Sequence, residues 1–125
     1  CQELKGEGIR QYAVTNGVVS TQRNKLSLSG LAQVMDGIFI SEEVGYEKPD
    51  VRFFETCFRQ IPDFRKEKTL IIGDSLTSDI KGGNLSGIAC CWYNPLRKEN
   101  ASGLRIDYEI TNLWEVEEIL SCQNP

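Results

Sequence analysis

The chain has 125 residues, of which 40% are hydrophobic and 26% are charged. This balance is typical of one globular domain with a buried core and excludes an intrinsically disordered chain. The net charge is −4 and no basic run stands out, so we expect no nucleic-acid partner. The sequence has neither a run of about 18 apolar residues nor a secretory signal, so we expect no membrane partner and a cytoplasmic location.

In the first half of the chain, short apolar runs alternate with helical patterns. We predict strands at 12–15 and 37–41, helices at 18–30 and 51–61, and a loop from Glu42 to Pro49. Asn16 and Gly17 form a turn signal after the first strand, and Asp50 can cap the second helix. The apolar residues of that helix recur at helical intervals, so we expect it to bury one face.

The second half continues the alternation. We predict strands at 69–72, 88–93 and 108–110, a helix at 76–84, and a last helix that begins at Asn112. Glu115 lies three residues after Asn112, which is the spacing of a capping box. The strands are unbroken apolar runs separated by helices. That pattern predicts an α/β fold with a parallel sheet covered on both faces.

The five cysteines are Cys1, Cys57, Cys90, Cys91 and Cys122. Their number is odd, none form C-x-x-C and the chain has no histidine, so we expect no structural zinc site. The adjacent pair Cys90-Cys91 admits a redox role. We interpret it instead as two small apolar residues of a strand in a protein of a reducing compartment.

Polar residues follow the third apolar run, where the sequence reads GDSLTSD. Gly73 allows a tight turn, Asp74 comes directly after the strand, and Asp79 lies in the first turn of the next helix. Ligands of parallel sheets bind outside the carboxyl ends of the strands, so both carboxylates can point into one cleft. Mg²⁺ favours few carboxylates together with waters and phosphate oxygens. Alternatively, Asp79 complements the helix dipole and Asp74 makes a turn.

Two other segments suit a phosphate. Thr15, Asn16 and Gly17 supply a hydroxyl and backbone amides at a strand end, although they also suit a plain turn. Lys48 can neutralise a phosphate as a point charge, although it also suits an exposed helix start. A hydroxyl-and-amide loop, a lysine and a double carboxylate, each beside a sheet element, are hard to obtain in this order by chance. The order favours a phosphate site with Mg²⁺ as cofactor.

These residues resemble the motifs of the haloacid dehalogenase-like (HAD) superfamily of hydrolases, and the resemblance extends over nearly the whole chain. Thr15-Asn16 resembles the second motif, Lys48 the third, and Gly73-Asp74 through Asp79 the fourth. Two further strings are similar to the pyrimidine 5′-nucleotidase branch, namely residues 40–45 with 48–50 and the run 79–95.

The resemblance implies a three-layer, Rossmann-like parallel sheet with helices on both faces, and a Mg²⁺-dependent phosphomonoester hydrolase that works through an aspartyl-phosphate intermediate. The substrate would be a small phosphorylated metabolite such as a nucleoside 5′-monophosphate. Dehalogenation, another activity of the superfamily, needs no metal, whereas this sequence has the metal carboxylates.

The resemblance also implies roles for single residues. Thr15, Asn16 and Gly17 would bind the phosphoryl oxygens. Lys48, a catalytic residue, would neutralise the phosphate and hold the attacking aspartate. Asp74 would ligate Mg²⁺, and Asp79 would do the same or orient the other ligands, directly or through water.

The superfamily's first motif, Asp-x-Asp, is absent, because no two aspartates are separated by one residue. We therefore predict that residues 1–125 are a single domain, the C-terminal part of a HAD-like core without its first-motif strand and cap, and inactive alone. Two apolar strand edges would then stand unpaired, so we expect a missing N-terminal segment or a neighbouring chain to complete the sheet. The alternative is a non-catalytic remnant or module that binds Mg²⁺ and phosphate only.

Overall fold

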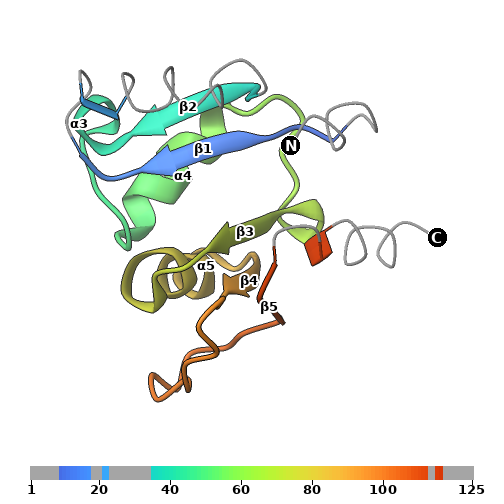
Figure 1. Ribbon diagram of the computed structural model, residues 1–125. Helices are drawn as coiled ribbons and strands as arrows, with labels where there is room; N and C mark the ends of the chain where they lie inside the picture. Colours follow the sequence, from blue (N-terminus) through green and yellow to red (C-terminus); the bar gives the residue numbers. More distant parts are fainter. Residues whose placement is uncertain (1–8, 18–20, 23–34, 113–114, 117–125) are drawn as a thin grey trace. The chain divides into compact units, whose positions relative to one another are not determined.

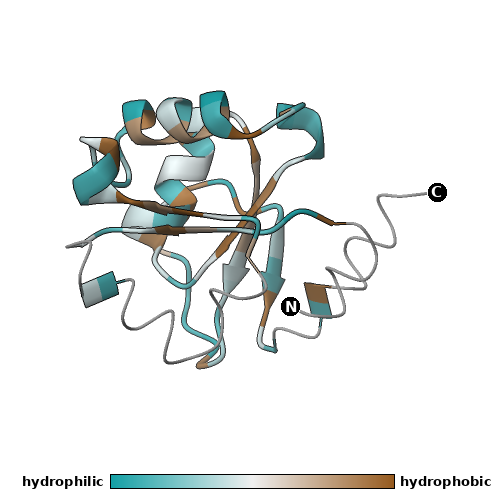
Figure 2. Ribbon diagram, turned by 90° about the horizontal axis from the view of Figure 1, so that it is seen from above, coloured by the Kyte–Doolittle hydropathy of each residue, from teal (hydrophilic) through white to brown (hydrophobic). Residues whose placement is uncertain are grey.

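The structure is a computed structural model that describes residues 9–17, 21–22, 35–112 and 115–116 (Figure 1). The chain divides into two compact units, Cys1–Cys57 and Phe58–Pro125, and each contains a parallel sheet. Hydrophobic residues run along the strands, whereas the helices carry both hydrophobic and hydrophilic residues (Figure 2). The expectation of a single domain stays a prediction.

The sheet of the first unit joins β1 (Tyr12–Thr15) and β2 (Gly37–Ile40) in parallel. Both confirm predicted strands, and β2 is one residue shorter than predicted. The Tyr12 ring stacks on that of Phe39, with ring centroids 5.7 Å apart. The register places the last residues of the two strands side by side. The loops that leave these strands therefore start from the same edge of the sheet.

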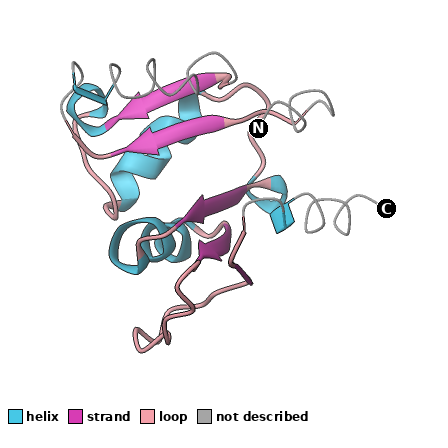
Figure 3. Ribbon diagram, in the orientation of Figure 1, coloured by secondary structure: helices cyan, strands magenta, loops and turns pink. Residues whose placement is uncertain are grey.

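The structure corrects one predicted loop. The segment 42–49 was expected to be irregular, but β2 runs directly into the helical turn α3 (Ser41–Val44) (Figure 3). Gly45 closes this turn in a left-handed conformation, φ +91°, and donates its N–H to the Ser41 carbonyl at 2.9 Å. Four residues are too few to show helical spacing, so periodicity could not predict this turn.

The helix α4 (Val51–Gln60) confirms the helix predicted at 51–61 and ends one residue earlier. Asp50 caps it as expected, because its Oδ1 accepts the Arg52 N–H at 2.9 Å. The Arg52 side chain also bonds to Asp50, which holds the pKa of that carboxyl below its ordinary value. The buried face of α4 consists of Phe53, Phe54 and Cys57.

The sheet of the second unit contains β3 (Leu70–Gly73), β4 (Ala89–Tyr93) and β5 (Tyr108–Ile110). All three strands are parallel, in the order β3-β4-β5. They confirm the predicted strands, with β3 moved by one residue and β4 starting one residue later. Because β3 is the first strand of this order, one of its edges has no strand partner within the described residues.

Three consecutive residues of β4, Cys90, Cys91 and Trp92, are buried. Neighbouring residues of a strand point to opposite faces, so this sheet is covered on both faces, as predicted. Both thiols are free, and burial raises the pKa of each, that of Cys91 to about 11. Both cysteines lie within β4 and are buried, which confirms the interpretation of the pair as strand residues.

The buried Cys91 thiol predicts a pH dependence of stability. Its pKa is raised from 9.0 to about 11 by burial first, and then by the charges of Glu115 and Cys90. The folded protein therefore holds this proton more tightly, so the stabilisation is complete below pH 9 and is lost between pH 9 and about 11. Between pH 9 and about 11, we expect the free energy of unfolding of the natural chain to fall by about 2–3 kcal/mol more than that of Cys91→Ala. Urea unfolding at several pH values measures this difference, and parallel curves for the two proteins would contradict it.

The segment after β3 also differs from its prediction of one helix at 76–84. A π-helical turn, Leu76–Ile80, comes first and the α-helix α5 (Lys81–Ser86) follows it. The Ser75 carbonyl accepts two N–H groups, from Asp79 at 3.0 Å and from Ile80 at 3.1 Å. These bonds widen the first turn beyond that of an α-helix, a feature that periodicity cannot reveal.

The remaining described residues are in short elements. A 3-10 turn, Lys66–Lys68, precedes β3, and residues 21–22 and 115–116 are helical. The Glu115 carboxylate accepts the Asn112 N–H at 3.3 Å, the contact expected of a capping box. The rest of the helices predicted at 18–30 and from Asn112 lies outside the described residues. In the described ranges, no helix is long and apolar enough to cross a membrane.

Candidate functional site

The loop after β1 is joined to the segment before α4 by two hydrogen bonds. The Asn16 side chain accepts the Lys48 N–H through Oδ1 at 2.8 Å and donates from Nδ2 to the Lys48 carbonyl at 3.1 Å. The peptide bond between Lys48 and Pro49 is cis. Asn16 thus uses both ends of its amide to hold the lysine backbone at the carboxyl end of β1.

The Lys48 side chain lies at the same strand end. Its Nζ donates to the Val14 carbonyl at 3.0 Å, and the residue is half-buried. Thr15 follows Val14 and is the last residue of β1, and its hydroxyl donates to the Asn16 carbonyl at 3.3 Å. A cation held at Val14 and a hydroxyl on Thr15 are the groups that the sequence predicts for phosphate binding.

Gly17 shapes this loop. Its N–H donates to the Ser41 Oγ at 2.8 Å, and that hydroxyl donates to the Gly17 carbonyl at 3.3 Å. Gly17 has a φ of +146°, and a Cβ there would overlap the Gln22 side chain, so only glycine fits. Ser41 directly follows β2, so the contact ties the two strand ends together. The predicted contact of Gly17 with phosphate stays a prediction.

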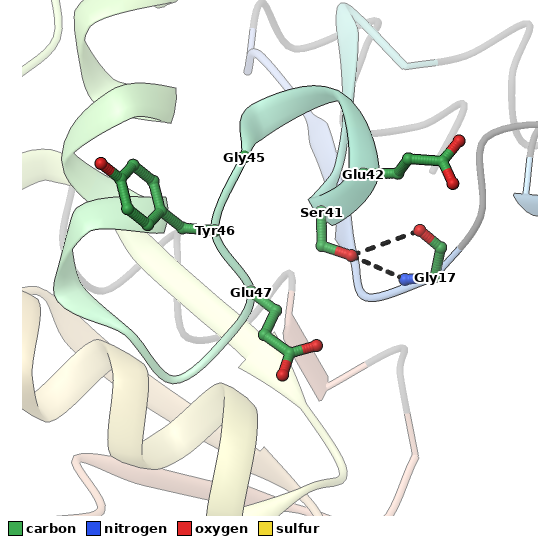
Figure 4. A pocket seen from close by; sticks show the side chains of 6 residues that line it. All are labelled: Gly17, Ser41, Glu42, Gly45, Tyr46 and Glu47. Carbon is green, nitrogen blue, oxygen red and sulfur yellow. Dashed lines mark hydrogen bonds between the residues drawn. The ribbon is translucent and has the colours of Figure 1, made fainter.

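An open hollow of about 430 Å³ lies beside the loop (Figure 4). It is lined by Gly17, Ser41, Glu42, Gly45, Tyr46 and Glu47. In Figure 4 the carboxylates of Glu42 and Glu47 lie on either side of the contact between Ser41 and Gly17. The hollow therefore borders the predicted phosphate loop and has an acidic lining.

The predicted metal carboxylates lie in the second unit, where β3 ends. Asp74 is exposed, and its backbone carbonyl accepts the Trp92 Nε1–H at 3.1 Å. Asp79 is 8% exposed, and its Oδ2 accepts the Ser75 N–H at 3.4 Å. One carboxylate is thus open to solvent and the other is held inside the turn. This difference fits the predicted roles, in which Asp74 binds the metal and Asp79 orients its ligands.

Gly73 provides the space in which the Asp79 carboxylate lies. A Cβ added at Gly73 would overlap the Cβ, Cγ and Oδ2 of Asp79. The side chain of Asp79 therefore packs against bare backbone at the end of β3. The glycine before Asp74 is required by this close approach.

Gly73→Ala is expected to lower the free energy of unfolding by about 1–3 kcal/mol, because the new methyl group and the Asp79 side chain cannot occupy the same space. The three atoms nearest to the added Cβ belong to Asp79, so Asp79→Gly is the matched control. In that background we expect the cost of Gly73→Ala to be smaller. Urea unfolding of the two single variants and the double variant measures the coupling, and strictly additive costs would contradict this packing.

The donor set of this site fits Mg²⁺. Within the described part of the chain, no group of three or more histidine, cysteine, aspartate or glutamate side chains could hold a metal ion. Asp74 and Asp79 offer two carboxylates after the end of β3. Zinc sites use three or four protein ligands, whereas Mg²⁺ keeps several waters and is bound by one or two carboxylates and phosphate oxygens.

The structure brings the predicted residues together in two groups. Thr15, Asn16 and Lys48 form one group in the first unit, and Asp74 and Asp79 form the other in the second unit. Within each group the residues lie at the carboxyl end of a parallel strand, as predicted from the strand-end rule.

Sequence reasoning missed two residues that support these groups. Ser41 follows β2, which ends at Ile40, but the sequence predicts a strand through residue 41 and so places Ser41 inside it. Trp92 bonds to the backbone of Asp74 from the neighbouring strand β4. No local pattern announces that bond, because it depends on strand pairing between residues 18 positions apart.

Three relatives show what the chain is similar to. YfnB of Bacillus subtilis, which carries a HAD-hydrolase name, is 49% identical over 113 residues, covering 90% of this chain and 48% of the relative. The pyrimidine 5′-nucleotidase PynA of Streptococcus pneumoniae is 45% identical over 111 residues, which cover 89% of this chain and 46% of PynA. The pyrimidine 5′-nucleotidase YjjG of Escherichia coli is 35% identical over 107 residues, which cover 86% of this chain and 48% of YjjG.

A crystal structure of YfnB bound to magnesium is also similar to this chain. The TM-score is 0.87 at 48% identity, and the similarity covers 90% of this chain and 49% of that one. The chain thus spans about half the length of the relatives it matches. The sequence pattern of the haloacid dehalogenase-like hydrolases matches residues 1–93. The predicted α/β fold and the predicted resemblance are both confirmed: the chain belongs to the family of haloacid dehalogenase-like hydrolases.

Proposed function

We propose that the whole protein is a Mg²⁺-dependent phosphomonoester hydrolase. The observation that carries the proposal is the pair of hydrogen bonds by which Asn16 holds Lys48 at the end of β1. The Lys48 ammonium donates to the Val14 carbonyl, one residue before Thr15, and phosphoryl transfer depends mainly on such positioning and charge neutralisation. In the second unit, the exposed Asp74 offers a carboxylate that would ligate the metal.

The proposed reaction has two steps. In the first, an aspartate oxygen bonds to phosphorus while the bond from phosphorus to the ester oxygen breaks, and the leaving oxygen takes a proton from a general acid. In the second, water attacks phosphorus, gives up a proton to the same group now acting as base, and releases phosphate and the free carboxylate. Lys48 and Thr15 bind the phosphoryl oxygens throughout.

The chain's own carboxylates would hold the metal. Asp74 ligates it, and Asp79, buried against Gly73, keeps the turn and the metal's ligands in place. When bound, Mg²⁺ supplies positive charge that offsets the charge of the phosphoryl oxygens. Lys48 adds a second positive charge from the protein itself.

Nucleoside 5′-monophosphates, and pyrimidine ones in particular, are the proposed substrates. The support is similarity, because two of the relatives are pyrimidine 5′-nucleotidases and their matches cover 86% or more of this chain. The same similarity extends through residues 40–50, which connect β2 to α4.

We also propose where the attacking aspartate comes from. The sequence has no Asp-x-Asp motif, and one edge of β3 has no strand partner within the described residues. A missing N-terminal segment or a neighbouring chain would pair with that edge and bring the aspartate. Residues 1–125 alone would then be inactive.

A second candidate is a non-catalytic module that binds only Mg²⁺ and phosphate. The absence of Asp-x-Asp from the sequence favours it for the isolated chain. Phosphate release measured for both the 125-residue chain and the whole protein separates the two candidates. Turnover by the whole protein but not by the 125-residue chain supports the enzyme. Turnover by the isolated 125-residue chain would refute the proposal that the attacking aspartate lies outside it.

The substrate proposal is tested by supplying the whole protein with uridine, thymidine, adenosine and guanosine 5′-monophosphates in Mg²⁺. We expect higher kcat/KM for the two pyrimidine nucleotides. Turnover of a generic phosphate ester without turnover of any nucleotide would leave the phosphatase in place and reject the nucleotidase.

The protein is further proposed to work in the cytoplasm. Cys57, Cys90 and Cys91 are free and buried, as is usual in a reducing compartment. Fractionation of the cells that make the protein tests the location.

A further inference from the structure

We propose that Asn16 is a site of spontaneous deamidation which the folded loop protects, and that Ser41 sets the degree of protection. The 125 residues contain one asparagine-glycine pair, Asn16-Gly17, in the loop after β1. The modification needs only water and base, so this part of the inference does not rest on the proposed function.

The chemistry starts at the backbone nitrogen of Gly17. Glycine has no Cβ to hinder ring closure, so an asparagine before glycine is especially labile. The Gly17 nitrogen loses its proton to base and attacks the Asn16 Cγ. The new bond from nitrogen to Cγ forms, the bond from Cγ to Nδ2 breaks, and the amide group takes up a proton and leaves as ammonia. Water then opens the cyclic imide at either carbonyl, adding its hydroxyl to carbon and its proton to nitrogen, which leaves aspartate or isoaspartate.

The two groups that must react are both held by hydrogen bonds. The Asn16 side-chain amide is bonded at both ends to the Lys48 backbone, at 2.8 Å and 3.1 Å. The Gly17 N–H, which must be deprotonated, donates to the Ser41 Oγ at 2.8 Å (Figure 4). The asparagine side chain and the glycine nitrogen are thus each held by a different partner.

The peptide group between the two residues is held as well. Its oxygen, the Asn16 carbonyl, accepts the Thr15 hydroxyl at 3.3 Å and the Gln22 Nε2–H at 3.2 Å. Ring closure therefore requires several hydrogen bonds to break first. The rate in the folded protein is the rate of the unprotected pair multiplied by the fraction of time that these bonds are broken.

Ser41 is the residue of this set that contacts the attacking group. Its hydroxyl also donates to the Gly17 carbonyl at 3.3 Å, so the loss of one hydroxyl removes two bonds to Gly17. Each such bond changes an opening equilibrium by about fivefold. We therefore expect Ser41→Ala to deamidate about tenfold faster than the natural protein while both are folded.

Deamidation would release Lys48 from its present position. An aspartate at position 16 can accept the Lys48 N–H, but it cannot donate to the Lys48 carbonyl as the Asn16 Nδ2 does. Its charge would also repel an anion bound beside Lys48. If the proposed function holds, the modification therefore weakens phosphate binding.

The test measures deamidation of the whole natural protein, Ser41→Ala and Ser102→Ala in mildly alkaline buffer, with and without denaturing urea. Trypsin releases residues 11–23 as one peptide, and fragmentation mass spectrometry measures the fraction converted at position 16. Ser102→Ala is the matched control, because Ser102 is exposed and lies in the second unit. In urea the three proteins should react at one rate, at least about tenfold above that of the folded natural protein.

The result expected is a faster reaction in folded Ser41→Ala and no change in folded Ser102→Ala. Equal rates for the natural protein with and without urea would overturn the inference, and so would equal rates for the two folded serine variants. If Ser41→Ala does not fold, Gln22→Ala replaces it, because Gln22 bonds to the Asn16 carbonyl. An unchanged rate in folded Gln22→Ala would then reject the protection.

The consequence for the phosphate loop is tested by the affinity of Asn16→Asp for inorganic phosphate. We expect it to be about tenfold lower than that of the whole natural protein. Equal affinity would overturn this consequence. A natural protein that binds no phosphate would overturn the proposed function, whereas the deamidation rates would still decide whether the loop protects Asn16.

Discussion

Replacing Asp74 by asparagine in the whole protein is expected to lower kcat/KM for phosphate-ester hydrolysis by about 10²–10³-fold. Asparagine keeps the shape of the side chain but removes the negative charge that a hard cation such as Mg²⁺ prefers. Asp74 is exposed at the end of β3, and its backbone is held by Trp92 in the neighbouring strand. The loss should therefore come from the metal site rather than from unfolding.

Two measurements separate those causes. Thermal unfolding of Asp74→Asn should stay close to that of the natural protein, and the Mg²⁺ concentration needed for half-maximal rate should rise. Asp63→Asn is the matched control, because Asp63 is exposed and asparagine tolerates its positive φ of 54°. A variant at Asp74 that keeps full activity with unchanged Mg²⁺ dependence would show that this carboxylate is not a metal ligand.

Lys48→Met is expected to reduce kcat/KM by a similar factor, about 10²–10³-fold. Methionine retains an unbranched apolar stem but lacks the ammonium that donates to the Val14 carbonyl. Lys48→Arg should recover only part of the activity, because a planar guanidinium does not match a site built around one point charge. The effect is expected on both kcat and KM, since the cation interacts with phosphate before and during the reaction.

Lys66→Met serves as the control for the loss of one positive charge, since Lys66 is exposed in the 3-10 turn before β3. Binding of inorganic phosphate should weaken in Lys48→Met and not in Lys66→Met. Equal phosphate affinity in the two variants would remove Lys48 from the phosphate site.

The strands were predictable because their signal is local. The segments 12–15 and 108–110 are found where the apolar runs place them, and β4 is buried on both faces as an unbroken apolar run implies. Thr15, Asn16 and Asp74 followed from the same pattern, because each lies where a parallel strand ends. The features that could not be predicted from the sequence are those that depend on contacts between residues far apart in the chain.

Asn16 illustrates that limit. Its position marks a turn, but its two bonds to Lys48 join residues 32 positions apart, and no sequence spacing encodes them. The π-helical turn at Leu76–Ile80 is similar, because it depends on the Ser75 carbonyl accepting two N–H groups. Ser41 could not be predicted for another reason: the apolar run 37–40 gives no sign that the strand ends before Ser41 rather than after it.

The most direct test of the account is release of inorganic phosphate from p-nitrophenyl phosphate by the whole natural protein, measured in Mg²⁺ and in excess EDTA. The account predicts turnover in Mg²⁺, a fall of at least about tenfold in EDTA, and recovery when Mg²⁺ is restored. A rate that is the same with and without the metal, or no phosphate release in Mg²⁺, would contradict the account.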